Sequence, residues 1–172
     1  MGFAATTATD EALNGIRLDG KHALVTGSTG GLGLETARAL ASVGASVTVS
    51  GRDPGKIDAA LGTLREQLPQ AKFDALELDL ASLSKIADAT KDYGGRGRPI
   101  DLLVNNAGVM MCPEGQTADG FETQTGTNHL GHFAWTAQMM PSLASGARIV
   151  TCLLYTSPSP RDQRGSRMPS SA

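Results

Sequence analysis

The sequence TGSTGGLG, which runs from Thr26 to Gly33, joins a short apolar strand pattern to a helical pattern. Glycine reaches positive φ at little cost, so this stretch can turn tightly between the two elements. Because glycine has no side chain, a pyrophosphate can also approach the backbone N–H groups at the start of the helix. Because a strand precedes the turn and a helix follows it, a glycine-rich turn that binds nothing is the weaker alternative.

We therefore expect a dinucleotide-binding turn between these elements. A P-loop would need a Lys and then a Ser or Thr after the last glycine, where Leu34 and Glu35 stand instead, so ATP hydrolysis is disfavoured. The expected contacts to the phosphates are Gly27, Ser28, Thr29, Gly30, Gly31, Leu32 and Gly33.

Strand and helix patterns alternate along the rest of the chain. Apolar or β-branched runs predict strands at 22–26, 46–50, 72–78, 101–104 and 147–151. Helical spacing of apolar residues lies between them, as in Leu34, Ala37, Leu40 and Ala41, in Ile57, Ala60, Leu61 and Leu64, and in Leu130, Phe133, Ala134 and Ala137. This alternation predicts an α/β fold, a Rossmann-type doubly wound parallel sheet that stops after about five strands.

The composition excludes several classes of protein. With 172 residues, of which 40% are hydrophobic and 19% charged, the chain is of ordinary globular composition. A net charge of −2 disfavours nucleic acid as a partner. The two cysteines lie in unrelated contexts, which argues against a disulfide framework and for a reducing, cytoplasmic location. No apolar run approaches the roughly 18 residues of a membrane span, so no membrane association is expected.

The end of the second expected strand bears on the choice of cofactor. A carboxylate directly at this point would bind ribose hydroxyls and repel a 2′-phosphate, whereas the sequence places Arg52 there and Asp53 one residue later. A guanidinium offers a planar cationic fork to a phosphate. Arg52 therefore favours NADP as the cofactor, with NAD and a merely solvated arginine as the alternatives.

Three further motifs follow later elements of the pattern. Asp79-Leu80 follows the third expected strand, and Asn105-Asn106-Ala107-Gly108 follows the fourth. Asn128 begins an Asn-x-x-Gly pattern that ends at Gly131. With the glycine turn, these motifs make residues 21–151 resemble the short-chain dehydrogenase/reductase family, in its classical type. Two sequences, TNHLGHF at 127–133 and GIRLDGK at 15–21, are most similar to those of the retinol-dehydrogenase-like branch.

The resemblance implies hydride transfer between a nicotinamide cofactor and a small-molecule carbonyl or alcohol, in a protein whose complete form is a homo-oligomer. It implies that Asp79 and Leu80 lie at the adenine ring and that Asn128 is a catalytic residue supporting a proton relay. It also implies cofactor contacts by Asn106, Ala107 and Gly108. The identity of the substrate does not follow from the fold.

Two histidines, His129 and His132, lie three residues apart in the last helical pattern. The sequence has no His-Glu-x-x-His pattern and no third ligand close by, so we expect packed or surface histidines and no metal site. Trp135, Met139 and Met140 are expected in the core or in an interface.

The sequence departs from the family where the family's proton donor is expected. In the family, a tyrosine supplies the proton, and a lysine four residues later lowers its pKa. The last lysine here is Lys91, and Cys152 stands where the family's serine is expected. We therefore expect this polypeptide to be inactive alone, the N-terminal portion of an oxidoreductase. A non-catalytic NAD(P)-binding sensor and a dimerisation module are the alternatives.

The chain divides into two parts by composition. Residues 1–151 are expected to form the dinucleotide-binding Rossmann domain, which is incomplete because the second half of the doubly wound sheet is missing. Residues 152–172 contain three of the eight prolines and resemble translated vector sequence, so we expect a disordered, non-native tail. An open sheet edge in such a chain predicts marginal stability or aggregation.

Overall fold

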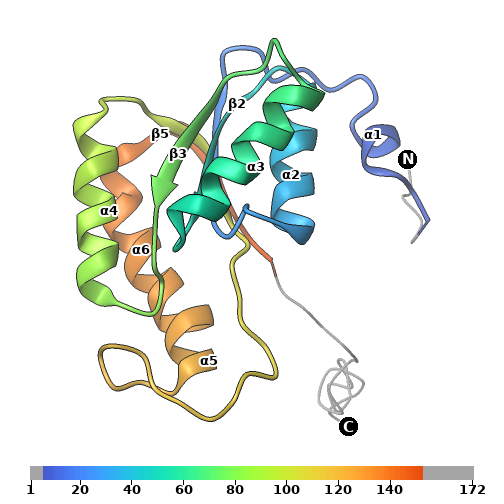
Figure 1. The fold of residues 1–172 in the computed structure, drawn as a ribbon. Coiled ribbons are helices and arrows are strands. Elements are labelled where there is room, and N and C mark those ends of the chain that lie inside the picture. The colour runs from blue at the N-terminus through green and yellow to red at the C-terminus, as the bar shows by residue number, and fades with distance from the viewer. Residues whose placement is uncertain (1–5, 153–172) are drawn as a thin grey trace, which may run out of the picture.

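The computed structural model describes residues 6–152, so the predicted tail lies outside the described residues apart from Cys152. Five parallel strands form one sheet in the order β3-β2-β1-β4-β5 (Figure 1). They are β1 (His22–Val25), β2 (Ser46–Gly51), β3 (Phe73–Glu77), β4 (Ile100–Asn105) and β5 (Leu143–Thr151). The predicted Rossmann-type α/β fold is confirmed.

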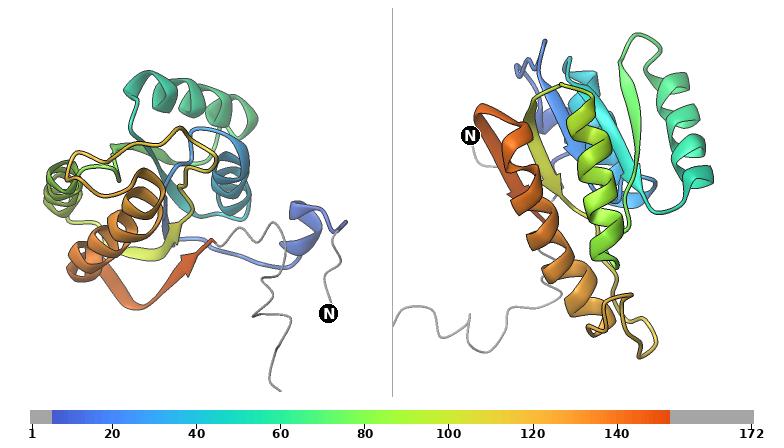
Figure 2. Two further views of the ribbon diagram at one scale, coloured as in Figure 1. Left: turned by 90° about the horizontal axis from the view of Figure 1, so that it is seen from below. Right: turned by 90° about the vertical axis from the view of Figure 1, so that its left-hand side faces the viewer.

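The helices lie on both faces of this sheet. They are α1 (Thr9–Ala12), α2 (Gly31–Ser42), α3 (Pro54–Gln67), α4 (Leu83–Gly95), α5 (Thr123–Thr125), the π-helical turn η1 (Gly126–Gly131), α6 (His132–Met139) and the 3₁₀ turn η2 (Met140–Ser142). Helices α2 and α3 cover one face, and α4 and α6 cover the other (Figure 2). Right-handed crossovers between parallel strands produce this two-sided cover.

The central strand β1 is buried on both faces, which explains why its sequence is apolar rather than alternating. Ala23 and Val25 pack in the core cluster under α2 and α3. Leu24, which points the other way, packs with Trp135 and Met139 of α6 in the second cluster. Each face of the sheet therefore has its own apolar core.

Local sequence signals set the starts of two of the helices. Asp53 caps α3, because its Oδ1 accepts a hydrogen bond of 3.1 Å from the Lys56 N–H, and Pro54 occupies the first helical position. Ser82 caps α4 in the same way through the N–H of Lys85. By contrast, Gly30 precedes α2 and provides no side-chain cap.

The apolar spacing that predicted the last helix gives its position correctly but does not identify its buried face. Phe133 is 71% exposed and Ala137 is exposed, whereas Trp135 and Met139 of the same helix are fully buried. The helix carries two apolar faces, and the face with the larger side chains packs on the sheet, since burial is worth more for a larger apolar area. The expectation that Trp135 and Met139 are core residues is confirmed, while Met140 is exposed.

Strand β5 begins four residues earlier than its sequence pattern predicts. Its pairing with β4 is irregular between Ile100 and Leu102, and Gly146 within it has φ of +77°. This start, Leu-Ala-Ser-Gly, contains no β-branched or aromatic residue and includes a glycine, so it gives no strand signal in the sequence. Ile149 and Val150 at its end are exposed, and within residues 6–152 no further strand pairs with β5.

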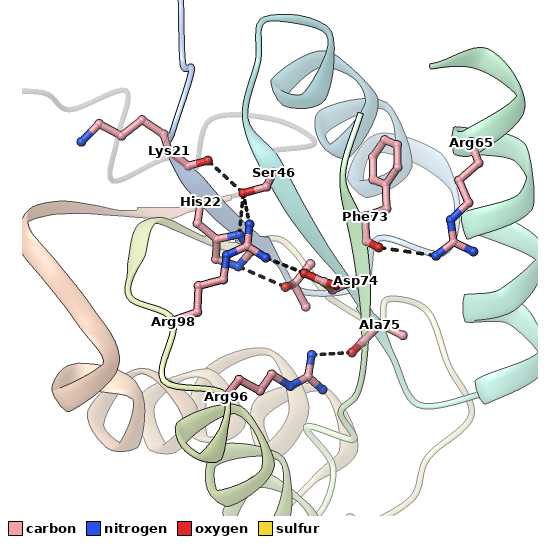
Figure 3. Close-up of polar contacts among 10 residues, drawn as sticks. Lys21, His22, Ser46, Arg65, Phe73, Asp74, Ala75, Arg96 and Arg98 are labelled. Carbon is pink, nitrogen blue, oxygen red and sulfur yellow. Dashed lines mark hydrogen bonds and ion pairs between the residues drawn. The ribbon is translucent and has the colours of Figure 1, made fainter. Parts of the chain in front are cut away.

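Arginine side chains gather at the other edge of the sheet, on β3 (Figure 3). Arg65 of α3 donates to the carbonyl of Phe73 at 3.4 Å, and Arg96, which follows α4, donates to the carbonyl of Ala75 at 2.9 Å. The carbonyl of Lys72 accepts from β2, so alternation directs the carbonyls of residues 73 and 75 away from the sheet. The two arginines therefore occupy the outward carbonyls of this edge strand.

A helix able to cross a membrane, which needs a long apolar stretch, does not occur in the described part of the chain.

Candidate functional site

The glycine turn follows β1 at the carboxyl end of the sheet, where α5 and the segment after β4 also lie (Figure 1). Gly27 has φ of +63°, and a Cβ placed on it would lie 2.8 Å from Cα of Ala107. A Cβ on Gly33 would collide with the carbonyl oxygen of Gly27 and with the side chain of Asn106. These two glycines are therefore required by the close approach of neighbouring segments.

Two other glycines keep one side of the turn open. A Cβ built on Gly30 or Gly31 has no heavy atom within 4 Å, and Gly30, Gly31 and Leu32 are all exposed. They stand at the start of the 12-residue helix α2, which has no side-chain cap. The first N–H groups of a helix lack partners within the helix and favour an anion. This open, uncapped turn fits the pyrophosphate of a dinucleotide.

Ser28 and Thr29 join the turn to the end of β2. The hydroxyl of Ser28 donates to the carbonyl of Val25 at 2.8 Å and accepts from the N–H of Ser50 at 2.9 Å. The N–H of Ser28 donates to the Ser50 carbonyl at 2.9 Å, so the polar groups of Ser28 face inward. Thr29 lies over Gly51, where a Cβ would be 2.8 Å from its methyl group.

This junction places Arg52 beside the glycine turn. Arg52 is exposed, and within residues 6–152 its guanidinium makes no hydrogen bond or ion pair. The neighbouring Asp53 is occupied as the cap of α3. At this end of β2, the Arg52 guanidinium is therefore free to bind an anion, whereas the Asp53 carboxylate is already used as the cap of α3.

Thr26 connects the glycine turn to the segment after β4. Its Oγ1 accepts hydrogen bonds from the N–H groups of Asn106 at 2.9 Å and Ala107 at 3.0 Å. The Asn106 side chain in turn donates to the carbonyls of Thr26 at 3.0 Å and Gly27 at 3.3 Å. Strands β1 and β4 are neighbours at the point where the strand order reverses, which is where doubly wound sheets bind their ligands.

Asn128 lies in η1 and contacts the same segment. Its Oδ1 accepts from the N–H of Val109 and its Nδ2 donates to the Val109 carbonyl, both at 2.8 Å. Gly108 also lies close, since a Cβ on it would be 3.5 Å from Oδ1 of Asn128. The structure therefore brings Asn128 together with the predicted residues Asn106, Ala107 and Gly108.

The turn after β3 packs against η1. Gly131 fits against the carbonyl of Leu80, which a Cβ at that position would strike. Leu80 is buried, and the carboxylate of Asp79 accepts from the N–H of Ala81 at 2.9 Å. The Asn-x-x-Gly pattern thus has a packing reason: its glycine allows the helical turn that carries Asn128 to approach the Asp79–Leu80 turn.

His132 was not among the predicted site residues, and the structure places it in contact with two of the segments that form the candidate site. It is buried between Thr26, whose Oγ1 lies 3.0 Å from its Nε2, and the carbonyl of Asn128, 3.0 Å from its Nδ1. Burial holds its pKa below the usual value for histidine. The only signal in the sequence was its position four residues after Asn128, which a helical turn brings close.

Comparison with known proteins identifies the family. The family model described as short chain dehydrogenase matches residues 21–155. This chain belongs to the short-chain dehydrogenase family. The chain is 44% identical over 138 residues to the polyprenol dehydrogenase of Mus musculus and 40% identical over 137 residues to retinol dehydrogenase 12 of Homo sapiens. These relatives confirm the predicted resemblance to a retinol-dehydrogenase-like branch.

The short-chain dehydrogenase match does not extend over whole relatives. The two alignments cover 77% and 78% of this chain but 41% and 43% of the relatives, so the chain spans about two fifths of their length. Among solved structures, a short-chain dehydrogenase from Burkholderia cenocepacia in complex with NADP is 28% identical, with a TM-score of 0.66. That likeness covers 79% of this chain and 56% of the solved one.

Tyr93 is the one tyrosine within residues 6–152, and it lies away from the candidate site. Its ring stacks on His22 at the amino end of β1, with 6.1 Å between ring centroids. Burial raises the pKa of Tyr93 to about 12. In the same described residues, no group of three or more His, Cys, Asp or Glu side chains is arranged to hold a metal ion.

Proposed function

We propose that this chain is the cofactor-binding part of an oxidoreductase and that it takes NADP in preference to NAD. The observation that carries the proposal is the open, uncapped start of α2 beside an arginine without a partner in the described part of the chain. The first feature suits a pyrophosphate, and the second suits the additional 2′-phosphate of NADP. The family's use of NAD(P) supports the proposal.

Each predicted residue has a role in this proposal. The turn from Gly27 to Gly33 holds the pyrophosphate, with Ser28 shaping the turn from inside and Gly30, Gly31 and Leu32 presenting their N–H groups. Arg52 binds the 2′-phosphate, and Asp79 with Leu80 lies at the adenine. Asn106, Ala107 and Gly108 line the remainder of the cofactor. When bound, NADPH supplies the hydride, and the chain's own residues bind and orient it.

We propose that this polypeptide lacks the family's donor for the proton that accompanies the hydride. Neither tyrosine is followed by a lysine at the fourth position, and the high pKa of Tyr93 keeps its proton in place at neutral pH. Both polar atoms of the Asn128 amide bond to Val109, which suits a residue that supports a proton relay. We therefore propose that the chain binds the cofactor and does not reduce carbonyl compounds by itself.

The whole protein is proposed to act on an apolar alcohol or carbonyl compound. Two relatives are named for polyprenol and retinol, which are alcohols with long apolar chains. In this chain, Val109 bonded to Asn128 is followed by Met110 and Met111, and Met111 is 89% exposed. We propose that these exposed apolar side chains, which follow the residue bonded to Asn128, contact the apolar part of the substrate.

Two measurements test the proposed function. Titration of the 172-residue chain with NADPH, followed by nicotinamide fluorescence, should give saturable binding that is at least about tenfold tighter than for NADH. An assay of NADPH oxidation with long-chain aldehydes should give no turnover above that of free NADPH. A chain that binds neither dinucleotide would refute the proposed function, and measurable turnover would refute the inactivity.

A further inference from the structure

The hydrogen bonds around Thr26 fix the direction of its hydroxyl proton. A threonine hydroxyl has one proton to donate and two lone pairs to accept with. Both lone pairs of Oγ1 are used, because the N–H groups of Asn106 and Ala107 donate to it at 2.9 and 3.0 Å. The hydroxyl must therefore donate to Nε2 of His132, its remaining neighbour at 3.0 Å.

The contact of the other imidazole nitrogen of His132 independently indicates the same protonation state. Its Nδ1 lies 3.0 Å from the carbonyl oxygen of Asn128, which can only accept a hydrogen bond. Nδ1 must carry a proton, and Nε2 must carry none. The two contacts together require the neutral imidazole with its proton on Nδ1.

These contacts close a ring of hydrogen bonds through three segments of the chain. The Thr26 hydroxyl bonds to His132, His132 bonds to the Asn128 carbonyl, and the Asn128 side chain bonds to Val109. From Val109 the backbone leads two residues back to Ala107, whose N–H returns to Thr26. The ring thus joins the glycine turn, the segment after β4 and the helical turn η1.

We propose that His132 is a positioning residue of the dinucleotide site, which holds η1 and Asn128 against the glycine turn through the Thr26 hydroxyl. This inference rests on the proposed function, because it assigns the ring to the site that binds NADP. His132 makes no contact with the open side of the cradle, since it is buried behind Thr26. Its effect on the cofactor is exerted through the placement of Asn106, Ala107 and Asn128.

The protonation state of His132 is directly measurable. Long-range ¹H–¹⁵N correlation spectra of the 172-residue chain at neutral pH should show one histidine locked as the Nδ1–H tautomer. The variant H132Q should remove that signal, while H129Q, which changes an exposed histidine in the same turn, should leave it in place. A signal for His132 with the proton on Nε2, or on both nitrogens, would overturn the proposed ring.

Three variants test the two hydrogen bonds of the His132 side chain separately. H132F removes both hydrogen bonds, H132Q can accept from the Thr26 hydroxyl through its side-chain oxygen, and H132N can donate to the Asn128 carbonyl. Loss of buried hydrogen bonds predicts that H132F weakens NADPH binding about tenfold. We expect H132Q and H132N each to recover part of that loss, and H129Q to bind as the wild type does.

The outcomes distinguish this inference from the proposed function. If the wild-type chain binds NADPH and a folded H132F variant binds it equally well, the positioning role is wrong and the proposed function stands. If the wild-type chain binds no NADPH, the proposed function fails, and the assignment of His132 to a cofactor site fails with it. Should H132F not fold, NADPH affinities of H132Q and H132N below that of the wild type, together with the Nδ1–H tautomer in the wild type, support the positioning role, and affinities equal to that of the wild type refute it.

Discussion

The side-chain amide of Asn106 lies 3.0 Å from the carbonyl oxygen of Thr26, to which its Nδ2 donates a hydrogen bond. The same nitrogen donates to the carbonyl of Gly27, and it fills the space that a side chain at Gly33 would need. One amide thereby holds the glycine turn closed from behind, while the open side of the turn remains available to a ligand.

Replacing this amide should loosen the turn. N106A leaves two partly buried carbonyl groups without this donor, which costs about 1–3 kcal/mol of unfolding free energy. Urea unfolding followed by circular dichroism measures the loss. N14A, at an exposed asparagine, is the matched control and should change the stability by no more than about 0.5 kcal/mol. Equal effects of both substitutions would contradict the role of Asn106.

Three glycine-to-alanine substitutions should give three different results. G33A forces a Cβ into the Gly27 carbonyl, so it should strongly destabilise the fold. G30A, where φ is −175° and the surrounding space is open, should fold normally and bind NADPH more weakly, since its methyl group intrudes into the cradle. G62A, on the exposed side of α3, should add about 0.5–1 kcal/mol of stability without changing binding.

Thermal melts and NADPH titrations of these three variants test the geometry of the turn. A G30A variant that binds NADPH as tightly as the wild type would show that the phosphates lie elsewhere. A G33A variant with unchanged melting would show that the turn is looser than its hydrogen bonds indicate.

The stability of the chain should fall in mild acid. Burial and the charge of Arg98 lower the pKa of His22 from 6.5 to about 4. The unfolded chain therefore binds a proton on this residue as the pH falls through about 6.5, and the folded chain does so only near 4. The contribution is fully present above the unfolded pKa, and between about pH 7 and pH 5 roughly 2 kcal/mol is lost.

Urea unfolding at these two pH values measures the loss, and the buried His132 adds to it in the same direction. The variant H22Q keeps a polar side chain for Ser46 and Thr48 but cannot titrate, so its stability should depend less on pH. An H22Q variant with the same pH dependence as the wild type would rule out His22 as the cause.

Much of the candidate site could be located from the sequence because its residues follow strands directly. Three of its segments directly follow strands, namely the glycine turn, Asp79-Leu80 and Asn106-Ala107-Gly108. Parallel strands bring all their carboxyl ends to the same end of the sheet. His132 could not be found in this way. Its partner Thr26 is 106 residues away, and a histidine four residues after an asparagine has no fixed meaning in a helix.

The fold was predicted well where one pattern dominated and less well where two competed. The apolar run of β1 allows a single interpretation. Helix α6 carries two apolar faces, and only packing on the sheet decides that Trp135 rather than Phe133 is buried. The early start of β5 was not predicted, because the segment from Leu143 to Gly146 is extended through its pairing with β4 and not through its own residues.

Removing the arginines of the β3 edge should promote association between chains. Arg65 and Arg96 occupy outward carbonyls that would otherwise be free to pair with another strand (Figure 3). Charged side chains on edge strands prevent such pairing. The double variant R65A/R96A should therefore scatter more light than the wild type on mild heating. The double variant R17A/R52A makes the same change in charge at exposed sites and should not.

The most direct test of the account is the site at which NADP meets the chain. Backbone ¹H–¹⁵N spectra recorded during a titration with NADP⁺ report every amide at once. If the cradle at the start of α2 holds the pyrophosphate, the largest shifts should fall on the amides of Gly30, Gly31 and Leu32, with a further shift at Arg52. Saturable binding with shifts confined to the opposite end of the sheet, around His22 and Ser46, would contradict the account.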